Sequence, residues 1–295
     1  MPAAASAAAS AARRQLQATI VKSGLLKTNA GVVPRPSPSL FYFPGITSKP
    51  VHAASNFHWA RVLEEEHATI KKEYLNLRAS KIQSDYTQQD GEHSLHQGKW
   101  DWHSYVLKGQ VQAPFAEHCP ETSRLLQEFH KQAFLMLGTP FSFSFFSTLH
   151  AQSVIAPHSG PSNLRLRCHL PIIVPKRKGK TGGKADGSQT SSASTPGGAS
   201  SPPSSSPPMD EYDSLEEIQA TVPCGIRIGD QVRAWEEGEC LVFDDAYEHE
   251  VWNRTEEERV LLLVDFWHPE IDREERVAIQ GMFDYAAKQG WMKGG

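Results

Sequence analysis

The chain has 295 residues, of which 39% are apolar and 22% charged, and its formal net charge is −4. This composition excludes a wholly disordered chain and predicts a soluble globular protein with one large core or two small ones. No apolar stretch approaches the roughly 20 residues that span a bilayer, and the four cysteines are scattered without a C-x-x-C pair, so we predict no membrane span and reduced thiols.

The N-terminal part is basic. Residues 1–63 contain seven lysines and arginines and no acidic residue, which leaves the rest of the chain with a net charge of −11. Residues 1–31 are rich in Ala and Ser and lack the apolar stretch of a secretory signal, a composition typical of an organellar transit peptide. A disordered tail without a targeting role fits equally well. We therefore predict a disordered basic leader over 1–38 and a protein of the cytoplasm, mitochondrion or plastid.

The first elements after the leader are predicted to be helical. The apolar cluster Phe41–Ile46 is expected to be the first piece that packs on the domain. Residues 57–79 show helical spacing of apolar side chains, namely Trp59, Val62, Leu63, Ile70, Tyr74, Leu75 and Leu77. A second helix is predicted to begin at Pro120, with one apolar face made of Leu125, Leu126, Phe129 and Phe134.

The following region alternates with period two, which predicts antiparallel strands and hairpins. The alternating stretches are 141–145, 163–170 and, after a Gly229-Asp230 turn, 232–235. A last helix is predicted to open at Pro269, with its buried side made of Ile271, Val277, Met282 and Phe283.

A low-complexity segment interrupts this strand region. Residues 176–220 are Lys, Gly, Ser, Thr and Pro for most of their length and then turn acidic, so we predict a disordered insertion. It marks either a domain boundary or a long hairpin, and because both flanks alternate we predict one domain over 39–175 and 221–295. The basic run at 176–180 resembles a nucleic-acid contact or an import signal. No aromatic residue is interleaved with it, so we predict no nucleic-acid partner.

One predicted strand carries charged residues at every second position. Arg165, Arg167 and His169 project from one face of that strand, whereas Leu164, Leu166 and Cys168 project from the other. Such a face is either exposed to solvent or binds a dicarboxylate, since arginine pairs bidentately with carboxylates.

A second cluster supports the dicarboxylate alternative. His249 follows an acidic turn, and Arg259 begins an apolar strand ten residues later. Two histidines from separate strands, flanked by arginines, predict an Fe(II) site with a 2-oxoacid cosubstrate.

The motifs around these residues resemble one family. The stretches 158–170, 235–239, 243–252 and 265–270 are similar to the aspartyl/asparaginyl β-hydroxylases, a family of 2-oxoglutarate oxygenases. The resemblance covers 98–175 and 221–270. It implies a mainly β fold with flanking helices, in which a double-stranded β-helix, a jelly-roll variant, holds the metal between two sheets. It also implies Fe(II), the cosubstrate 2-oxoglutarate and O2.

The resemblance implies roles for individual residues. His158 and His249 match the two iron ligands, and Ser147 and Arg259 match the pair that binds the distal carboxylate of 2-oxoglutarate. Without the resemblance, Ser147 reads as an ordinary strand hydroxyl.

Four further residues are assigned in the same way. Arg167 and His169 match groups around the metal-proximal end of 2-oxoglutarate, and Trp100 matches a tryptophan that lines its pocket. Arg165 matches an arginine near the substrate carboxylate. The alternatives are a core aromatic for Trp100 and a surface charge for Arg165.

The third metal position is predicted to lack a carboxylate. Many non-haem iron oxygenases place an acid two residues after the first histidine, where this chain has Gly160. Water, a substrate group or the carboxylate of Asp245 must then fill the position. The resemblance associates this glycine with peptide substrates, and the missing charged ligand predicts weaker iron retention.

The sequence thus predicts an Fe(II)/2-oxoglutarate dioxygenase that hydroxylates the β-carbon of Asp or Asn. The expected partner is a peptide or protein rather than a small molecule. Two alternatives remain open, namely the same chemistry on a free amino acid or lipid, and a jelly-roll module that binds metal or dicarboxylate without turnover.

Overall fold

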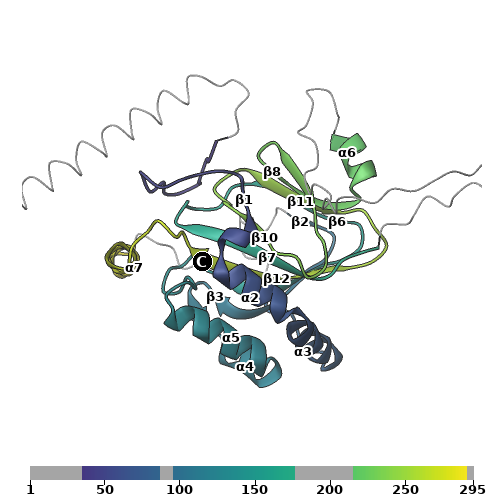
Figure 1. Ribbon diagram of the computed structural model, residues 1–295, viewed down its shortest axis with the longest axis horizontal. Coiled ribbons are helices and arrows are strands. Elements are labelled where there is room, and N and C mark those ends of the chain that lie inside the picture. Colours follow the sequence, from purple (N-terminus) through teal and green to yellow (C-terminus); the bar gives the residue numbers. More distant parts are fainter. Residues whose placement is uncertain (1–34, 87–95, 177–214, 291–295) are drawn as a thin grey trace, which may run out of the picture.

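The computed structural model describes residues 35–86, 96–176 and 215–290 (Figure 1). Residues 1–34 of the predicted leader and 177–214 of the predicted insertion lie outside the described residues. The end of the insertion range is helical, because α6 spans Leu215–Thr221 and buries Ile218. The prediction of disorder therefore extends too far at that end. None of the helices in the described ranges is long and apolar enough to cross a membrane.

Twelve strands of the described residues form two antiparallel sheets. The larger sheet contains, in spatial order, β1 (Val51–His52), β10 (Leu241–Phe243), β7 (Arg165–Ile173), β12 (Arg259–Trp267), β5 (Ser144–Leu149), β3 (Trp100–Leu107) and β4 (Gln110–Val111). The smaller sheet contains β2 (His96–Gln97), β6 (Ser153–His158), β11 (His249–Asn253), β8 (Cys224–Ile228) and β9 (Gln231–Ala234).

The order of these strands is that of a jelly-roll. Between β5 and β12 the chain repeatedly crosses from one sheet to the other, and each sheet receives four of these eight strands. They lie in the order β10-β7-β12-β5 in the larger sheet and β6-β11-β8-β9 in the smaller one. The predicted double-stranded β-helix with flanking helices is confirmed.

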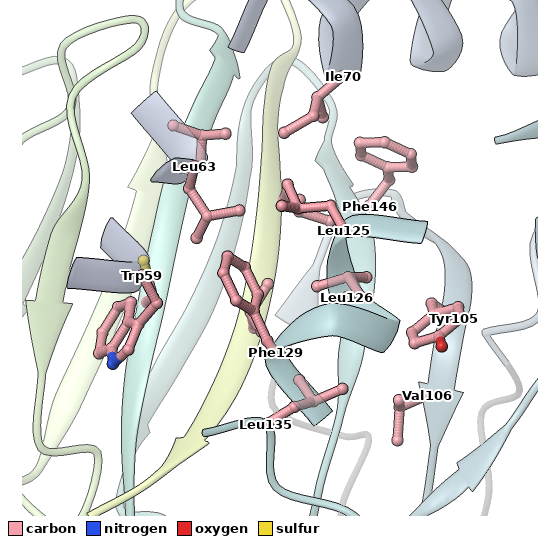
Figure 2. Packing of buried hydrophobic residues seen from close by; sticks show 14 of the residues in the cluster. Trp59, Leu63, Ile70, Tyr105, Val106, Leu125, Leu126, Phe129, Leu135 and Phe146 are labelled. Atoms are coloured by element: carbon pink, nitrogen blue, oxygen red, sulfur yellow. The ribbon is translucent and has the colours of Figure 1, made fainter. Parts of the chain in front are cut away.

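Helices cover the outer face of the larger sheet (Figure 1). They are α2 (His58–Glu65), α3 (His67–Ala79), α4 (Ala113–His118) and α5 (Pro120–Lys131), with the short 3-10 helix η1 (Ala54–Asn56) before them. Outward side chains of β12 meet them, and Phe266 stacks on Trp59 with ring centroids 3.8 Å apart. Figure 2 shows Leu63, Leu126 and Phe129 in this cluster. The helix predicted for 57–79 is in fact two, because the backbone turns at Glu66.

The last helix, α7 (Arg273–Lys288), differs from its prediction. Asp272 caps it in a capping box with Glu275, so it starts four residues after Pro269. Ile271 and Phe283 are buried as predicted, but Val277 is 68% exposed and Met282 is 41% exposed. The prediction was wrong for these two residues because α7 buries only a narrow stripe, in which Ile279 and Phe283 are one helical turn apart.

The inner faces of the two sheets enclose the charged residues. Arg165 is 2% exposed and His169 is 5% exposed, so the solvent-facing alternative for this strand face is wrong. Leu166 and Cys168, which alternate with them, pack into the outer cluster under the helices. The polar side of β7 therefore faces the space between the sheets.

Candidate active site

Two histidines from neighbouring strands lie side by side between the sheets. His158 ends β6 and His249 begins β11, and the two residues are paired in the strand register. Their ring centroids are 4.2 Å apart. A register shift follows His249 in this pairing, as in a β-bulge, a feature that often re-aims side chains next to active sites.

Both rings are held in the tautomer that a metal needs. Nδ1 of His158 lies 2.8 Å from the carbonyl oxygen of Ala156, and Nδ1 of His249 lies 2.9 Å from that of Tyr247. Because a carbonyl can only accept, each Nδ1 carries the hydrogen and each Nε2 keeps a lone pair. Burial lowers the pKa of His249 to about 3 and also lowers the pKa of His158, so both rings are neutral at pH 7.

The position beside Gly160 is filled by the carboxylate of Asp245. A Cβ atom built on Gly160 would lie 2.5 Å from Oδ2 and 2.8 Å from Oδ1 of Asp245. The two residues are also joined through the backbone, since Gly160 donates its N–H to the carbonyl of Asp245 at 2.6 Å. Among the described residues, no group of three or more His, Cys, Asp and Glu side chains is placed to bind a metal ion. The structure therefore offers two histidines, with a carboxylate nearby.

Asp245 belongs to a buried cluster of two arginines and two aspartates. Nη2 of Arg165 lies 2.5 Å from Asp245 and Nη1 lies 3.0 Å from Asp265, while Nε of Arg167 lies 2.8 Å from Asp265. Burial alone would raise the pKa of Asp245, but Arg165 and Arg167 outweigh it and hold that pKa well below its usual range. The cluster is formally neutral, and Arg165 contacts aspartates rather than solvent.

Arg259, by contrast, has no carboxylate partner in the described part of the chain. It is 2% exposed, and its Nε and Nη2 atoms make no hydrogen bond to any residue that the structure describes. Its guanidinium lies 4.8 Å from the centroid of the Trp235 ring. Burial lowers the pKa of Arg259 to about 10, so the group is still charged at pH 7. A buried guanidinium without an anion is costly, and a carboxylate that reached it would relieve that cost.

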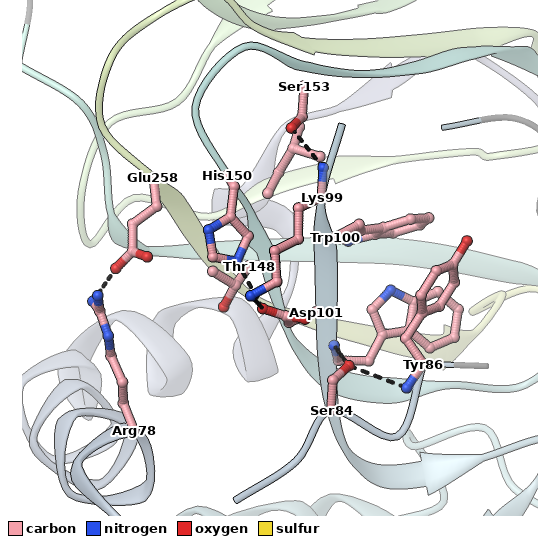
Figure 3. Close-up of polar contacts among 12 residues, drawn as sticks. Arg78, Ser84, Tyr86, Lys99, Trp100, Asp101, Thr148, His150, Ser153 and Glu258 are labelled. Carbon is pink, nitrogen blue, oxygen red and sulfur yellow. Dashed lines mark hydrogen bonds and ion pairs between the residues drawn. The ribbon is translucent and has the colours of Figure 1, made fainter. Parts of the chain in front are cut away.

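Ser147 and Trp100 meet beside Arg259. Nε1 of Trp100 donates to Oγ of Ser147 at 2.9 Å, which leaves the hydroxyl hydrogen of Ser147 available to another acceptor. In the register of β5 and β12, Ser147 pairs with Leu261 and is therefore a diagonal neighbour of Arg259. Figure 3 shows Trp100 and Asp101 on opposite sides of β3, with Asp101 directed to His150.

His169 lies between the histidine pair and Arg259. Its ring is 4.9 Å from that of Phe243 and 6.1 Å from that of Trp235, and its Nδ1 has no hydrogen-bond partner among the described residues. Burial and the charge of Arg259 keep the pKa of His169 well below its usual value. Trp235 and Asp265 were part of the motifs, but the sequence assigned them no role.

The fold and these residues define a jelly-roll protein with a pair of buried, neutral histidines between its two sheets. The chain belongs to the aspartyl/asparaginyl β-hydroxylase family, whose model matches residues 64–192 and 215–269. This confirms the family predicted from the motifs.

Individual relatives are distant. An aspartyl/asparaginyl β-hydroxylase of Mus musculus is 28% identical over 60% of this chain and 18% of its own length. An aspartate β-hydroxylase domain-containing protein 2 of Xenopus tropicalis is 25% identical over 84% of this chain and 56% of its own. An ornithine lipid ester-linked acyl 2-hydroxylase of Rhizobium tropici is 28% identical over 75% of this chain and 61% of its own length. The chain thus spans only part of the relatives it matches.

Similarity to a solved structure is weaker. A prolyl-4-hydroxylase of Pseudomonas putida aligns with 71% of this chain and 98% of its own, with 10% sequence identity and a TM-score of 0.36.

Proposed function

We propose that the chain is an Fe(II)- and 2-oxoglutarate-dependent dioxygenase that hydroxylates the β-carbon of Asp or Asn in a peptide or protein. The observation that carries this proposal is the combination of two neutral histidines with free Nε2 atoms and a buried arginine whose Nε and Nη2 lack a partner in the described residues. Membership of the β-hydroxylase family supports the reaction class.

His158 and His249 would hold the iron through their Nε2 atoms. The carbonyl oxygens of Ala156 and Tyr247 restrain both rings and keep each Nε2 available to a metal. With 2-oxoglutarate and O2, the bound iron would supply hydroxylation of an unactivated C–H bond, with release of succinate and CO2. Because Gly160 supplies no ligand, a further coordination position would be left to water, to substrate or to the carboxylate of Asp245, which lies against Gly160.

Arg259 and Ser147 would bind the distal carboxylate of 2-oxoglutarate. A carboxylate there supplies the missing acceptor for Nε and Nη2 of Arg259 and accepts the Ser147 hydroxyl hydrogen. Trp100 orients that hydroxyl. His169 and Arg167 lie on the same strand face toward the histidine pair and would contact the other end of the cosubstrate, where Nδ1 of His169 still lacks a partner among the described residues.

The assignment of Arg165 to a substrate carboxylate remains a prediction. Its guanidinium is bound to Asp245 and Asp265, so a substrate carboxylate would reach it only in competition with them. Phe243 and Leu261 line the same interior and would keep water from the reacting centre.

A second substrate class is supported by one relative. The Rhizobium tropici protein, which covers 75% of this chain, is named as an acyl hydroxylase of a lipid. The same site chemistry on a lipid or free amino acid is therefore the alternative proposal, and a binding module without turnover is the third.

The test measures succinate formed from 2-oxoglutarate by the full chain with added Fe(II). We expect turnover to be lost in His158→Ala and His249→Ala and retained in the matched control His150→Ala, whose ring bonds to Asp101 outside the site. The same reactions with Asp- and Asn-containing peptides, ornithine lipids and free amino acids are then scored by mass for one added oxygen atom. If the wild-type chain forms no more succinate than the histidine variants, the enzyme proposal is wrong. If only lipids gain an oxygen atom, a lipid replaces the peptide as the proposed substrate.

A further inference from the structure

Residues 35–50, which we call the N-terminal strap, run along the edge of the candidate active site. Their backbone N–H groups donate to carbonyl oxygens beside the two histidines. These bonds join Ser37 to Ala246 at 2.7 Å, Ser39 to Gly160 at 3.0 Å, and Phe41 to Pro161 at 2.9 Å.

The strap contacts two segments that we call the site loops. The first, 159–163, follows His158 directly. The second, 244–247, is separated by one residue from His249, which opens β11. The loops themselves share only a short direct backbone link, from Gly160 N–H to the carbonyl of Asp245. The strap therefore bridges both loops from the outside.

Asn163 fastens the strap to the first loop. It is 1% exposed, and its side-chain amide bonds both backbone groups of Phe43: Oδ1 accepts from the N–H at 2.6 Å, and Nδ2 donates to the carbonyl at 2.9 Å. A buried amide satisfied in this way fixes both position and direction of the segment that it binds.

Asp244 fastens the far end of the strap to the second loop. Its Oδ2 accepts from the hydroxyl of Ser48 at 2.7 Å, and its N–H donates to the carbonyl of Pro50 at 3.2 Å. The next residue, Val51, begins β1, which pairs with β10. The strap is thus held at both ends, each time by a site loop.

The site has a physical need for such a brace. A carboxylate on residue 160 would tie the first loop to the metal, but glycine forms no such bond and has the freest backbone of all residues. The conformation of the loop must therefore come from its surroundings. The family model begins at residue 64, so the strap lies outside the part of the chain that it matches.

We propose that the N-terminal strap is a positioning element of the metal centre, with Asn163 as its principal contact. By bonding both site loops, the strap holds His158, Gly160 and His249 in the geometry that binds metal. This inference rests on the proposed function.

The experiment compares Mn(II) binding and metal-free hydrogen exchange in full-length variants. Asn163→Ala removes both side-chain bonds to Phe43, and we expect it to weaken Mn(II) binding at least tenfold, in the range of about 10–100-fold seen when groups that orient metal ligands are removed. Exchange should rise in 159–163 and 244–247 but not in the β8–β9 hairpin. Ser48→Ala, which removes the bond to Asp244, should shift both readouts in the same direction by less.

The matched control is Ile279→Ala. Ile279 lies on α7 and belongs to the apolar cluster on which Phe41 and Phe43 pack, and that cluster contains no residue of either site loop. It should lower the thermal midpoint without changing the Mn(II) affinity of the folded protein.

Three results would overturn the inference. The first is equal Mn(II) affinity of the wild type and Asn163→Ala. That result would leave the proposed function intact. The second is an equal loss of affinity in Ile279→Ala, since the effect is then one of general stability. A wild-type protein that binds no Mn(II) would overturn the proposed function along with the inference. If Asn163→Ala does not fold, the same comparison is decided with Ser48→Ala.

Discussion

Replacing Asp245 by alanine removes the carboxylate that two buried arginines share. In the folded protein the Asp245 side chain is fully buried, and it lies 2.5 Å from Arg165 and 3.4 Å from Arg167. After the substitution Asp265 alone faces two guanidinium groups, so the interior carries one uncompensated positive charge.

The magnitude follows from that burial. Breaking a buried ion pair by removing one partner costs about 3–5 kcal/mol, because the remaining charge is desolvated without compensation. For a protein of this size 1 kcal/mol shifts the thermal midpoint by about 2–4 °C, so Asp245→Ala should lower it by roughly 6–20 °C. The matched control Asp101→Ala breaks pairs with Lys99 and His150, whose side chains are 67% and 30% exposed, and should cost about 1 kcal/mol or less.

Thermal and urea unfolding of both variants measure this difference. A double variant, Asp245→Ala with Arg165→Met, removes the excess charge and should recover part of the loss. A loss of stability in Asp245→Ala no larger than that in Asp101→Ala, or a double variant less stable than the single one, would contradict the shared ion pair.

Three further predictions concern neighbouring positions. Arg259→Met should raise the KM for 2-oxoglutarate at least tenfold, as measured by steady-state kinetics. Because it removes a buried charge that has no partner among the described residues, it should leave the free protein as stable or up to about 4 kcal/mol more stable in urea unfolding. Gly160→Ala should destabilise by about 1–3 kcal/mol, since its Cβ overlaps the Asp245 carboxylate, and the cost should fall in an Asp245→Ala background, as a double-mutant cycle would show. Burial raises the pKa of Asp244 to about 7 from 3.8, so the folded state holds an extra proton between these pH values. The free energy of unfolding of the wild type should therefore fall relative to that of Asp244→Asn, by up to about 4 kcal/mol, as pH rises from about 4 to 7. Urea unfolding that gives identical pH profiles for the two proteins would contradict this.

Much of the fold was predictable because its signals are local. Alternation at 163–170 placed Arg165, Arg167 and His169 on one face, and the structure confirms this. Helix boundaries were less accurate, as at Glu66, where two helices meet without an interrupting Gly or Pro. The buried stripe of α7 was misjudged for Val277 because several apolar residues compete for one narrow contact.

The partners of the arginines were not predictable. Arg165 and Asp245 are 80 residues apart, and Arg167 and Asp265 are 98 apart, so their pairing depends on how β7 lies against β10 and β12. The same arrangement decides that Arg259 receives no carboxylate partner from the described residues. A sequence pattern with period two contains no information on register between distant strands.

The sequence by itself indicated the family, singled out His158 and His249, and placed the charged residues of one strand on a shared face. Each of these depends on residue identity and spacing within a short stretch. Only the tertiary structure decided that this face points inward, that the Asp245 carboxylate lies against Gly160, and that residues 35–50 bridge both site loops. These features arise from packing between segments far apart in the chain, where burial makes a charge without a partner costly and makes a charge with a partner part of the core.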